Sequence, residues 1–179
     1  MSSKISHHES RTWNYDVFLS FRGEDTRKTF TDHLYAALNQ RGIHTFRDDE
    51  ELERGMSISP ELLKAIESSR IAIVVFSKDY ASSKWCLEEL AKIIDCINGY
   101  SKGPRTVFPV FYHVDPSDVQ KLQGCYGEAM ERHERELPVQ EMEKVRRWRS
   151  ALSRAASLSG WDVKRDNGGY PYSFPYSYL

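Results

Sequence analysis

Apolar and polar residues along the chain form alternating blocks that predict strands followed by helices. The nearly continuous apolar run at residues 15–21 is typical of a strand buried on both faces, as in a parallel sheet. Further strands are expected at 43–46, 71–76, 106–112 and 160–163. Helical spacing predicts helices from Asp25 or Thr26 to Gly42, from Ser59-Pro60 onward, and over 83–98, 125–137 and 141–159, with a plain turn at 113–119.

This repeated strand–helix alternation predicts an α/β domain, with a parallel sheet covered by helices on both faces and right-handed crossovers. We expect a disordered N-terminal tail at residues 1–13, a folded domain at 14–163 and an irregular tail at 164–179. Pro171 and Pro175 exclude a regular helix in that last segment. Ligands of such sheets bind beyond the carboxyl ends of the strands.

The predicted helix at 83–98 carries an unusual pair of side chains. Its apolar stripe is Leu87, Leu90, Ala91, Ile94 and Ile97. At about 100° per residue, Trp85 and Glu89 fall on the other side of the helix, one above the other. An aromatic wall beside a carboxylate suits a site that stacks a flat ring and stabilises a cation. The structural alternative is a Trp packed under a loop and a solvated Glu.

Two more candidate features follow strands. The turn Arg22-Gly23-Glu24-Asp25 precedes a helix N-terminus, which favours phosphate binding, although a plain connecting turn remains an alternative. A charged loop at 47–55 is longer than such connections need to be, and it is either functional or a solvated surface loop. Because these two features and the segment 77–89 all follow strands, we expect them to converge on one cleft.

Composition adds mainly exclusions. The 179 residues are 40% hydrophobic and 28% charged with a net charge of −1, which gives no reason to expect nucleic acid or anionic membrane as a partner. The basic face of the 141–159 helix fits a solvated surface in a neutral protein. Without an apolar leader, and with three cysteines that form no CxxC pair, the chain is expected in the cytoplasm, with the nucleus as an alternative. No metal site is expected.

Four stretches together resemble a known family. They are YDVFLSFRGEDTR at 15–27, FRDD at 46–49, ASSKWCLEEL at 81–90 and PVFYHVDPSDV at 109–119. In this order they are similar to the Toll/interleukin-1 receptor (TIR) domain of plant disease-resistance proteins, over residues 13–163.

The resemblance implies a three-layer, flavodoxin-like fold with a five-stranded parallel sheet and a role in innate immune signalling. It also implies NAD+ hydrolase activity that depends on self-association, with NADP+ as a second candidate substrate and no cofactor. By this likeness Glu89 is the catalytic acid, in preference to Glu88, which lies further from Trp85 around the helix. The residues that it places against the substrate are Phe21, Arg22, Gly23, Asp48, Glu53, Gly55, Ser83 and Trp85.

The sequence departs from the family pattern at two places. Asp32-His33 stands where many relatives have a Ser-His pair at a self-association surface. The family's last helix, which pairs protomers, has no counterpart after Gly168-Gly169. We therefore expect association with itself or with other TIR domains, in a geometry that the sequence leaves open.

Three alternatives to an NAD+ nucleosidase remain. A non-enzymatic adaptor would act by binding other TIR domains. A phosphoacceptor receiver domain has a similar fold but needs acidic residues after the first and third strands, and Phe76-Ser77 supplies none after the third. A nucleoside deoxyribosyltransferase shares the fold type and a catalytic Glu.

Overall fold

A computed structural model describes residues 13–48, 58–99, 103–104, 106–163 and 174–179. Five parallel strands form one sheet in the order β2-β1-β3-β4-β5. Their bounds are β1 Tyr15–Phe21, β2 Thr45–Arg47, β3 Ser69–Phe76, β4 Thr106–Tyr112 and β5 Trp161–Val163. This is the flavodoxin-like order, so the predicted fold class is confirmed.

Helices connect the strands and cover the sheet. Their bounds are α1 Gly23–Thr26, α2 Phe30–Gln40, α3 Pro60–Glu67, α4 Lys84–Ile97, α5 Pro116–Lys121, α6 Gly124–Glu136 and α7 Met142–Ala156, with single 3-10 turns at Tyr80–Ser82, Val139–Glu141 and Tyr176–Tyr178. Ser59 caps α3 by accepting the N–H of Leu62 at 3.1 Å, as the Ser-Pro pair predicts. Among the described helices, none is long and apolar enough to cross a membrane.

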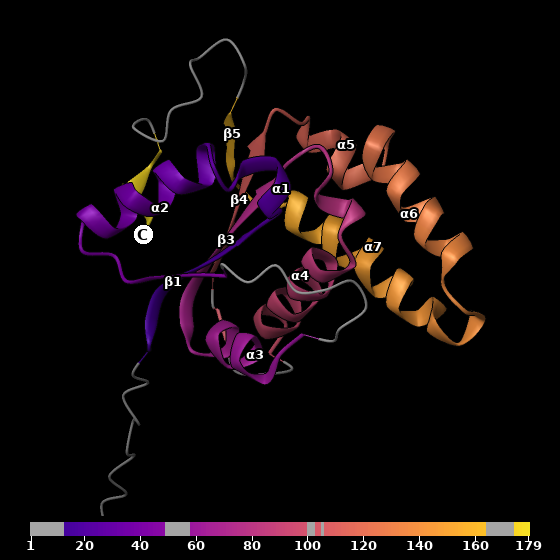
Figure 1. Cartoon of the computed structure of the whole chain (residues 1–179), viewed down its shortest axis with the longest axis horizontal. Helices are drawn as coiled ribbons and strands as arrows, with labels where there is room; N and C mark the ends of the chain where they lie inside the picture. The colour runs from indigo at the N-terminus through magenta and orange to yellow at the C-terminus, as the bar shows by residue number, and fades with distance from the viewer. Residues whose placement is uncertain (1–12, 49–57, 100–102, 105, 164–173) are drawn as a thin grey trace, which may run out of the picture.

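Two hydrophobic clusters fill the two sides of the sheet. Alternating residues of β1 and β3 supply both clusters, since Phe18 and Ala72 belong to one while Val17 and Ile71 belong to the other. In Figure 1, α2 lies on one side of the strands, whereas α3, α4 and α7 lie on the other, with α5 and α6 further out. Strands β1 and β3 are therefore buried on both faces, which explains their continuous apolar runs.

The end of the chain covers the same side of the sheet as α2. Phe174 is buried and packs edge-on against Phe108 and Trp161, with ring centroids 5.3 Å and 5.2 Å away. The Arg41 guanidinium lies 3.8 Å from the centre of the Tyr176 ring. Within 174–179 the only regular element is the single 3-10 turn.

Three local predictions were wrong in detail. The second strand is shifted to Thr45–Arg47, because it pairs with β1 through Val17↔Thr45 and Leu19↔Arg47. The segment predicted as a plain turn contains the short helix α5, which Asp115 caps by accepting the N–H of Ser117 at 2.7 Å. The first helical segment is split into α1 and α2.

Helix α4 is buried on two sides, which revises the interpretation of its apolar stripe. Leu87, Leu90, Ala91 and Ile94 are buried as predicted, whereas Ile97 is only partly buried. A second buried row consists of Cys86, Glu89, Ile93 and Cys96. The side of the helix that the spacing assigned away from the core therefore also lies in the protein interior.

A close backbone approach fixes the turn before β5. A Cβ on Gly160 would lie 2.2 Å from the carbonyl oxygen of Pro109 in β4. We expect Gly160→Ala to lower the free energy of unfolding by about 1–3 kcal/mol, because either the turn or β4 must shift. Urea denaturation measures this change, with the exposed Ser159→Ala as the control. Equal denaturation midpoints for the two variants would contradict the prediction.

Candidate functional site

The carboxyl group of Glu89 lies inside the domain, against the sheet. Only 3% of the residue is exposed. Ser20, at the end of β1, donates a hydrogen bond from Oγ to Glu89 Oε2 over 2.7 Å. Glu89 is therefore not a solvated helix residue, and the structural alternative for this side chain is wrong.

A chain of hydroxyl groups continues from Ser20 away from the carboxyl. Ser20 Oγ lies 2.9 Å from the phenolic oxygen of Tyr80, in the 3-10 turn before α4. Tyr80 Oη donates to the carbonyl oxygen of Cys86 at 3.1 Å. Ser20 and Tyr80 are both fully buried, so these contacts are shielded from water.

The environment of Glu89 disfavours its charged form. The pKa of the Glu89 carboxyl is raised from 4.5 to about 8, because burial and the negative charge of Asp48 together outweigh the side-chain hydrogen bonds from Ser20 and Trp85, which lower it. At neutral pH most Glu89 carboxyls in the free protein are consequently protonated. A strongly shifted acid in the interior is a candidate functional group.

Trp85 shares this environment, as the helical spacing predicted. Its ring is partly buried against the core, and its side chain forms a hydrogen bond with Glu89. Glu88 instead points toward α7, where it lies 3.7 Å from Arg147. Ser83 caps α4 by accepting the N–H of Cys86 at 3.2 Å, so its hydroxyl already has a structural role.

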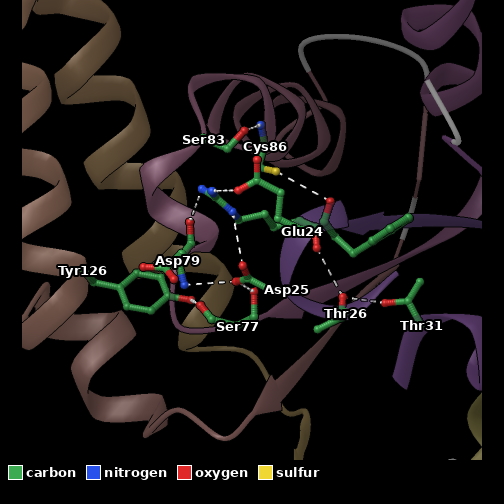
Figure 2. Close-up of polar contacts among 11 residues, drawn as sticks. Glu24, Asp25, Thr26, Thr31, Ser77, Asp79, Ser83, Cys86 and Tyr126 are labelled. Atoms are coloured by element: carbon green, nitrogen blue, oxygen red, sulfur yellow. Dashed lines mark hydrogen bonds and ion pairs between the residues drawn. The ribbon is translucent and has the colours of Figure 1, made fainter. Parts of the chain in front are cut away.

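Asp25 joins the loop after β1 to the loop after β3. It accepts hydrogen bonds from Ser77 Oγ at 2.5 Å and from the N–H of Asp79 at 3.1 Å, and it pairs with Arg22 Nε at 3.2 Å. Figure 2 shows Asp25 beside Ser77 and Asp79, with Tyr126 reaching the same loop. Arg22 also donates to the Asp79 carbonyl at 3.0 Å and pairs with Glu24. The predicted role of Asp25 as a helix cap is replaced by this cross-link.

The structure brings Arg22, but not the side chain of Phe21, toward the α4 segment. Phe21 packs in the cluster on the α2 side of the sheet, and only its carbonyl oxygen, which accepts from the Cys86 thiol at 3.6 Å, faces α4. Successive strand residues point to opposite faces, so Ser20 reaches Glu89 where Phe21 cannot. Gly23 begins α1 directly after Arg22.

The loop after β2 contributes one described residue to the site. Asp48 is partly buried, and its charge acts on Glu89, which places the end of β2 beside the carboxyl. The predicted substrate residues Glu53 and Gly55 lie outside the described residues. The strand ends and the α4 segment therefore converge around Glu89.

Asp32 and His33 occupy a different part of the surface. Both are exposed on α2, and Asp32 Oδ1 accepts from Arg47 Nη1 at 2.9 Å. Their predicted role in self-association stays a prediction.

Cys86 is a poor candidate for a nucleophile. Burial raises the pKa of its thiol, and the neighbouring Glu89 raises it further, so the reactive thiolate is disfavoured. Across the described part of the chain, no group of three or more His, Cys, Asp or Glu side chains is arranged to hold a metal ion. Among the described residues, Glu89 is therefore the candidate for chemistry in this interior site.

Sequence reasoning missed Ser20, Tyr80 and the cross-linking role of Asp25. A signal for Ser20 was present, because a hydroxyl in an otherwise apolar buried strand requires a hydrogen-bond partner. The partner itself is 69 positions away along the chain, and only the packing of α4 on β1 identifies it.

Comparisons with known proteins agree with the resemblance. The model of the family described as TIR domain matches residues 14–168. Disease resistance protein RUN1 of Vitis rotundifolia is 57% identical over 86% of this chain and 11% of its own length. TMV resistance protein N of Nicotiana glutinosa is 54% identical over 88% of this chain and 13% of its own length. The chain thus spans about a tenth of the length of these curated relatives.

A solved structure supports the same assignment. The TIR domains in the structure of the activated Roq1 resistosome directly recognizing the pathogen effector XopQ are 56% identical to this chain, with a TM-score of 0.76. The match covers 87% of this chain and 91% of that chain. On its sheet order, its sequence and these matches, the chain belongs to the TIR domain family and is homologous to the TIR domains of plant disease-resistance proteins.

Proposed function

We propose that this TIR domain signals in plant innate immunity by hydrolysing NAD+ at its bond to nicotinamide, with Glu89 as the catalytic residue. The observation that carries the proposal is the position of the Glu89 carboxyl, buried beside the ends of β1 and β2 and hydrogen-bonded by Ser20. Relatives named as disease-resistance proteins support the signalling role.

The proposed reaction needs one carboxylate. The bond between C1′ of the ribose and the nicotinamide nitrogen breaks, and its electron pair neutralises the cationic nicotinamide ring. The remaining ribosyl centre is oxocarbenium-like, as in glycoside cleavage, and the Glu89 carboxylate stabilises it. Water adds at C1′ and releases a proton, giving nicotinamide and ADP-ribose. No general acid is required, because nicotinamide leaves as a neutral molecule.

Substrate contact requires a change at the site. Glu89 is nearly covered in the free protein, and its carboxyl is mostly protonated at neutral pH. NAD+ binding must therefore uncover the carboxyl and favour its ionised form, which the positive charge of the nicotinamide ring does. We expect the isolated chain to have low activity, and assembly with other TIR domains to activate it by opening this closed arrangement.

A second candidate function is that of an adaptor that acts only by binding other TIR domains. The observation in its favour is the exposed surface of α2 at Asp32 and His33, together with the occurrence of similar TIR domains in an activated resistosome. Under this function the chain would assemble and signal without consuming NAD+.

The pH dependence of NAD+ cleavage tests the proposed function. We expect kcat/KM to rise about tenfold per pH unit from pH 6 and to level off above about pH 8, because catalysis needs the ionised form of Glu89, whose pKa is raised to about 8. Nicotinamide release, with products identified by mass, measures this at high protein concentration. A chain that assembles but leaves NAD+ intact at every pH would support the adaptor function instead.

A further inference from the structure

The number of protons available for hydrogen bonds among the buried groups around Glu89 depends on whether Glu89 is ionised. Three oxygen–oxygen contacts run in a row: Glu89 to Ser20 at 2.7 Å, Ser20 to Tyr80 at 2.9 Å, and Tyr80 to the Cys86 carbonyl at 3.1 Å. Each hydroxyl carries one proton, and a carboxyl carries one only when it is neutral. Neutral Glu89 therefore gives three protons for three contacts, and ionised Glu89 gives two.

Either charge state has a consistent arrangement of these protons. With Glu89 neutral and its proton on Oε2, the carboxyl donates to Ser20, which reverses the bond that Ser20 donates to the carboxylate, and Ser20 donates to Tyr80 and Tyr80 to the Cys86 carbonyl. With Glu89 ionised, Tyr80 turns its proton to Ser20, and Ser20 donates to the carboxylate. The contact that is then given up is the one to the Cys86 carbonyl, which lies inside α4, where carbonyl groups accept a helical N–H.

We propose that Ser20 and Tyr80 form a reversible hydrogen-bond relay whose hydroxyl groups rotate to match each charge state as Glu89 exchanges its proton with solvent, a positioning role that rests on the function proposed above. The proton leaves to solvent when the cationic substrate arrives and returns after the product has left. Tyr80 does not contact the carboxyl itself. It acts through Ser20 by supplying the second donor of a chain that ends on the carboxylate.

The relay matters because the described residues around Glu89 supply no cation to stabilise its charge. Among them, the titratable groups that interact with Glu89 are Asp48 from the end of β2, Tyr80 from the turn before α4, and Cys86 on α4 itself. None of these is a cation. A buried carboxylate therefore depends on hydrogen bonds from Ser20 and Trp85, and a donor chain that polarises Ser20 strengthens one of them.

The test replaces the hydroxyl of Tyr80 and follows the titration of Glu89. We expect Tyr80→Phe in the full chain to raise the Glu89 pKa by about one unit, because the ionised form of Glu89 loses more hydrogen-bond stabilisation than the neutral form does. Carboxyl-carbon NMR of the protein without substrate measures this shift. The acid limb of the pH profile of NAD+ cleavage should move to higher pH by the same amount, and activity should recover at high pH.

Tyr126→Phe is the matched control. Tyr126 is equally buried and, like Tyr80, lies edge-on to Phe76, but its hydroxyl donates to the Ser77 carbonyl at 2.7 Å and not to the relay. It should leave the Glu89 titration unchanged. An unshifted Glu89 pKa in folded Tyr80→Phe would overturn the relay, whether or not the protein cleaves NAD+. Absence of NAD+ cleavage with a shifted titration would overturn only the proposed function.

The wild-type protein gives a second readout in case the variant does not fold. With ζ-carbon-labelled tyrosine, the Tyr80 resonance should move with the same midpoint as the Glu89 carboxyl, because its proton changes acceptor there. The Tyr126 resonance should not follow this midpoint. A Tyr80 resonance that stays constant through the Glu89 titration would contradict the relay.

Discussion

Glu89→Gln is expected to reduce NAD+ cleavage by about 10²–10³-fold, because the amide cannot supply the negative charge that stabilises the ribosyl cation. Nicotinamide release by the purified variant, at the pH where the wild type is most active, measures the loss. Glu88→Gln is the matched control, since Glu88 is next in sequence but lies toward Arg147 on α7. The control should retain wild-type activity.

Glu89→Gln should be inactive although it remains folded. Burial raises the Glu89 pKa from 4.5 to about 8, so the folded protein holds a proton that the unfolded chain releases. This contribution to stability is full below pH 4.5 and is lost as the pH rises to about 8. The stability of Glu89→Gln relative to wild type should therefore increase between pH 5 and pH 8, as thermal melting can show. An inactive variant that is instead unfolded at pH 8 would leave the catalytic assignment without support.

Asp25→Ala is expected to lower the free energy of unfolding by about 2–4 kcal/mol. The Asp25 carboxylate accepts from Ser77 and from the Asp79 N–H, and it pairs with Arg22. Its removal leaves these partly buried donors without their acceptor and releases the loop after β1 from the loop after β3. Chemical denaturation at pH 7 measures the change.

Glu24→Ala is the comparison that separates burial from charge. Glu24 also pairs with Arg22, but its side chain is 72% exposed, whereas that of Asp25 is 15% exposed. Exposed ion pairs contribute about 0–1 kcal/mol, so Glu24→Ala should change stability little. Equal effects of the two variants would show that Asp25 does not cross-link the loops.

Much of the fold was predictable because it depends on local patterns. The apolar run of β1 and the Ser59-Pro60 start of α3 were placed correctly, since burial on both faces and helix capping leave direct marks in the sequence. The short strand β2 was shifted because its limits depend on pairing with β1. Helix α5 was missed because a two-turn helix has too few residues to show a period.

The candidate site also has a part that the sequence predicted and a part that only the structure revealed. The helical period alone brought Trp85 and Glu89 together and separated Glu89 from Glu88, because residues four apart lie on one side of a helix. It could not show whether that side faces water. Only the packing of α4 against β1 decided that the Glu89 carboxyl is buried, that Ser20 donates a hydrogen bond to it, that Tyr80 contacts Ser20, and that the pKa of the carboxyl is raised to about 8. Burial and long-range hydrogen bonds depend on which elements meet in space, and a single sequence records that only indirectly.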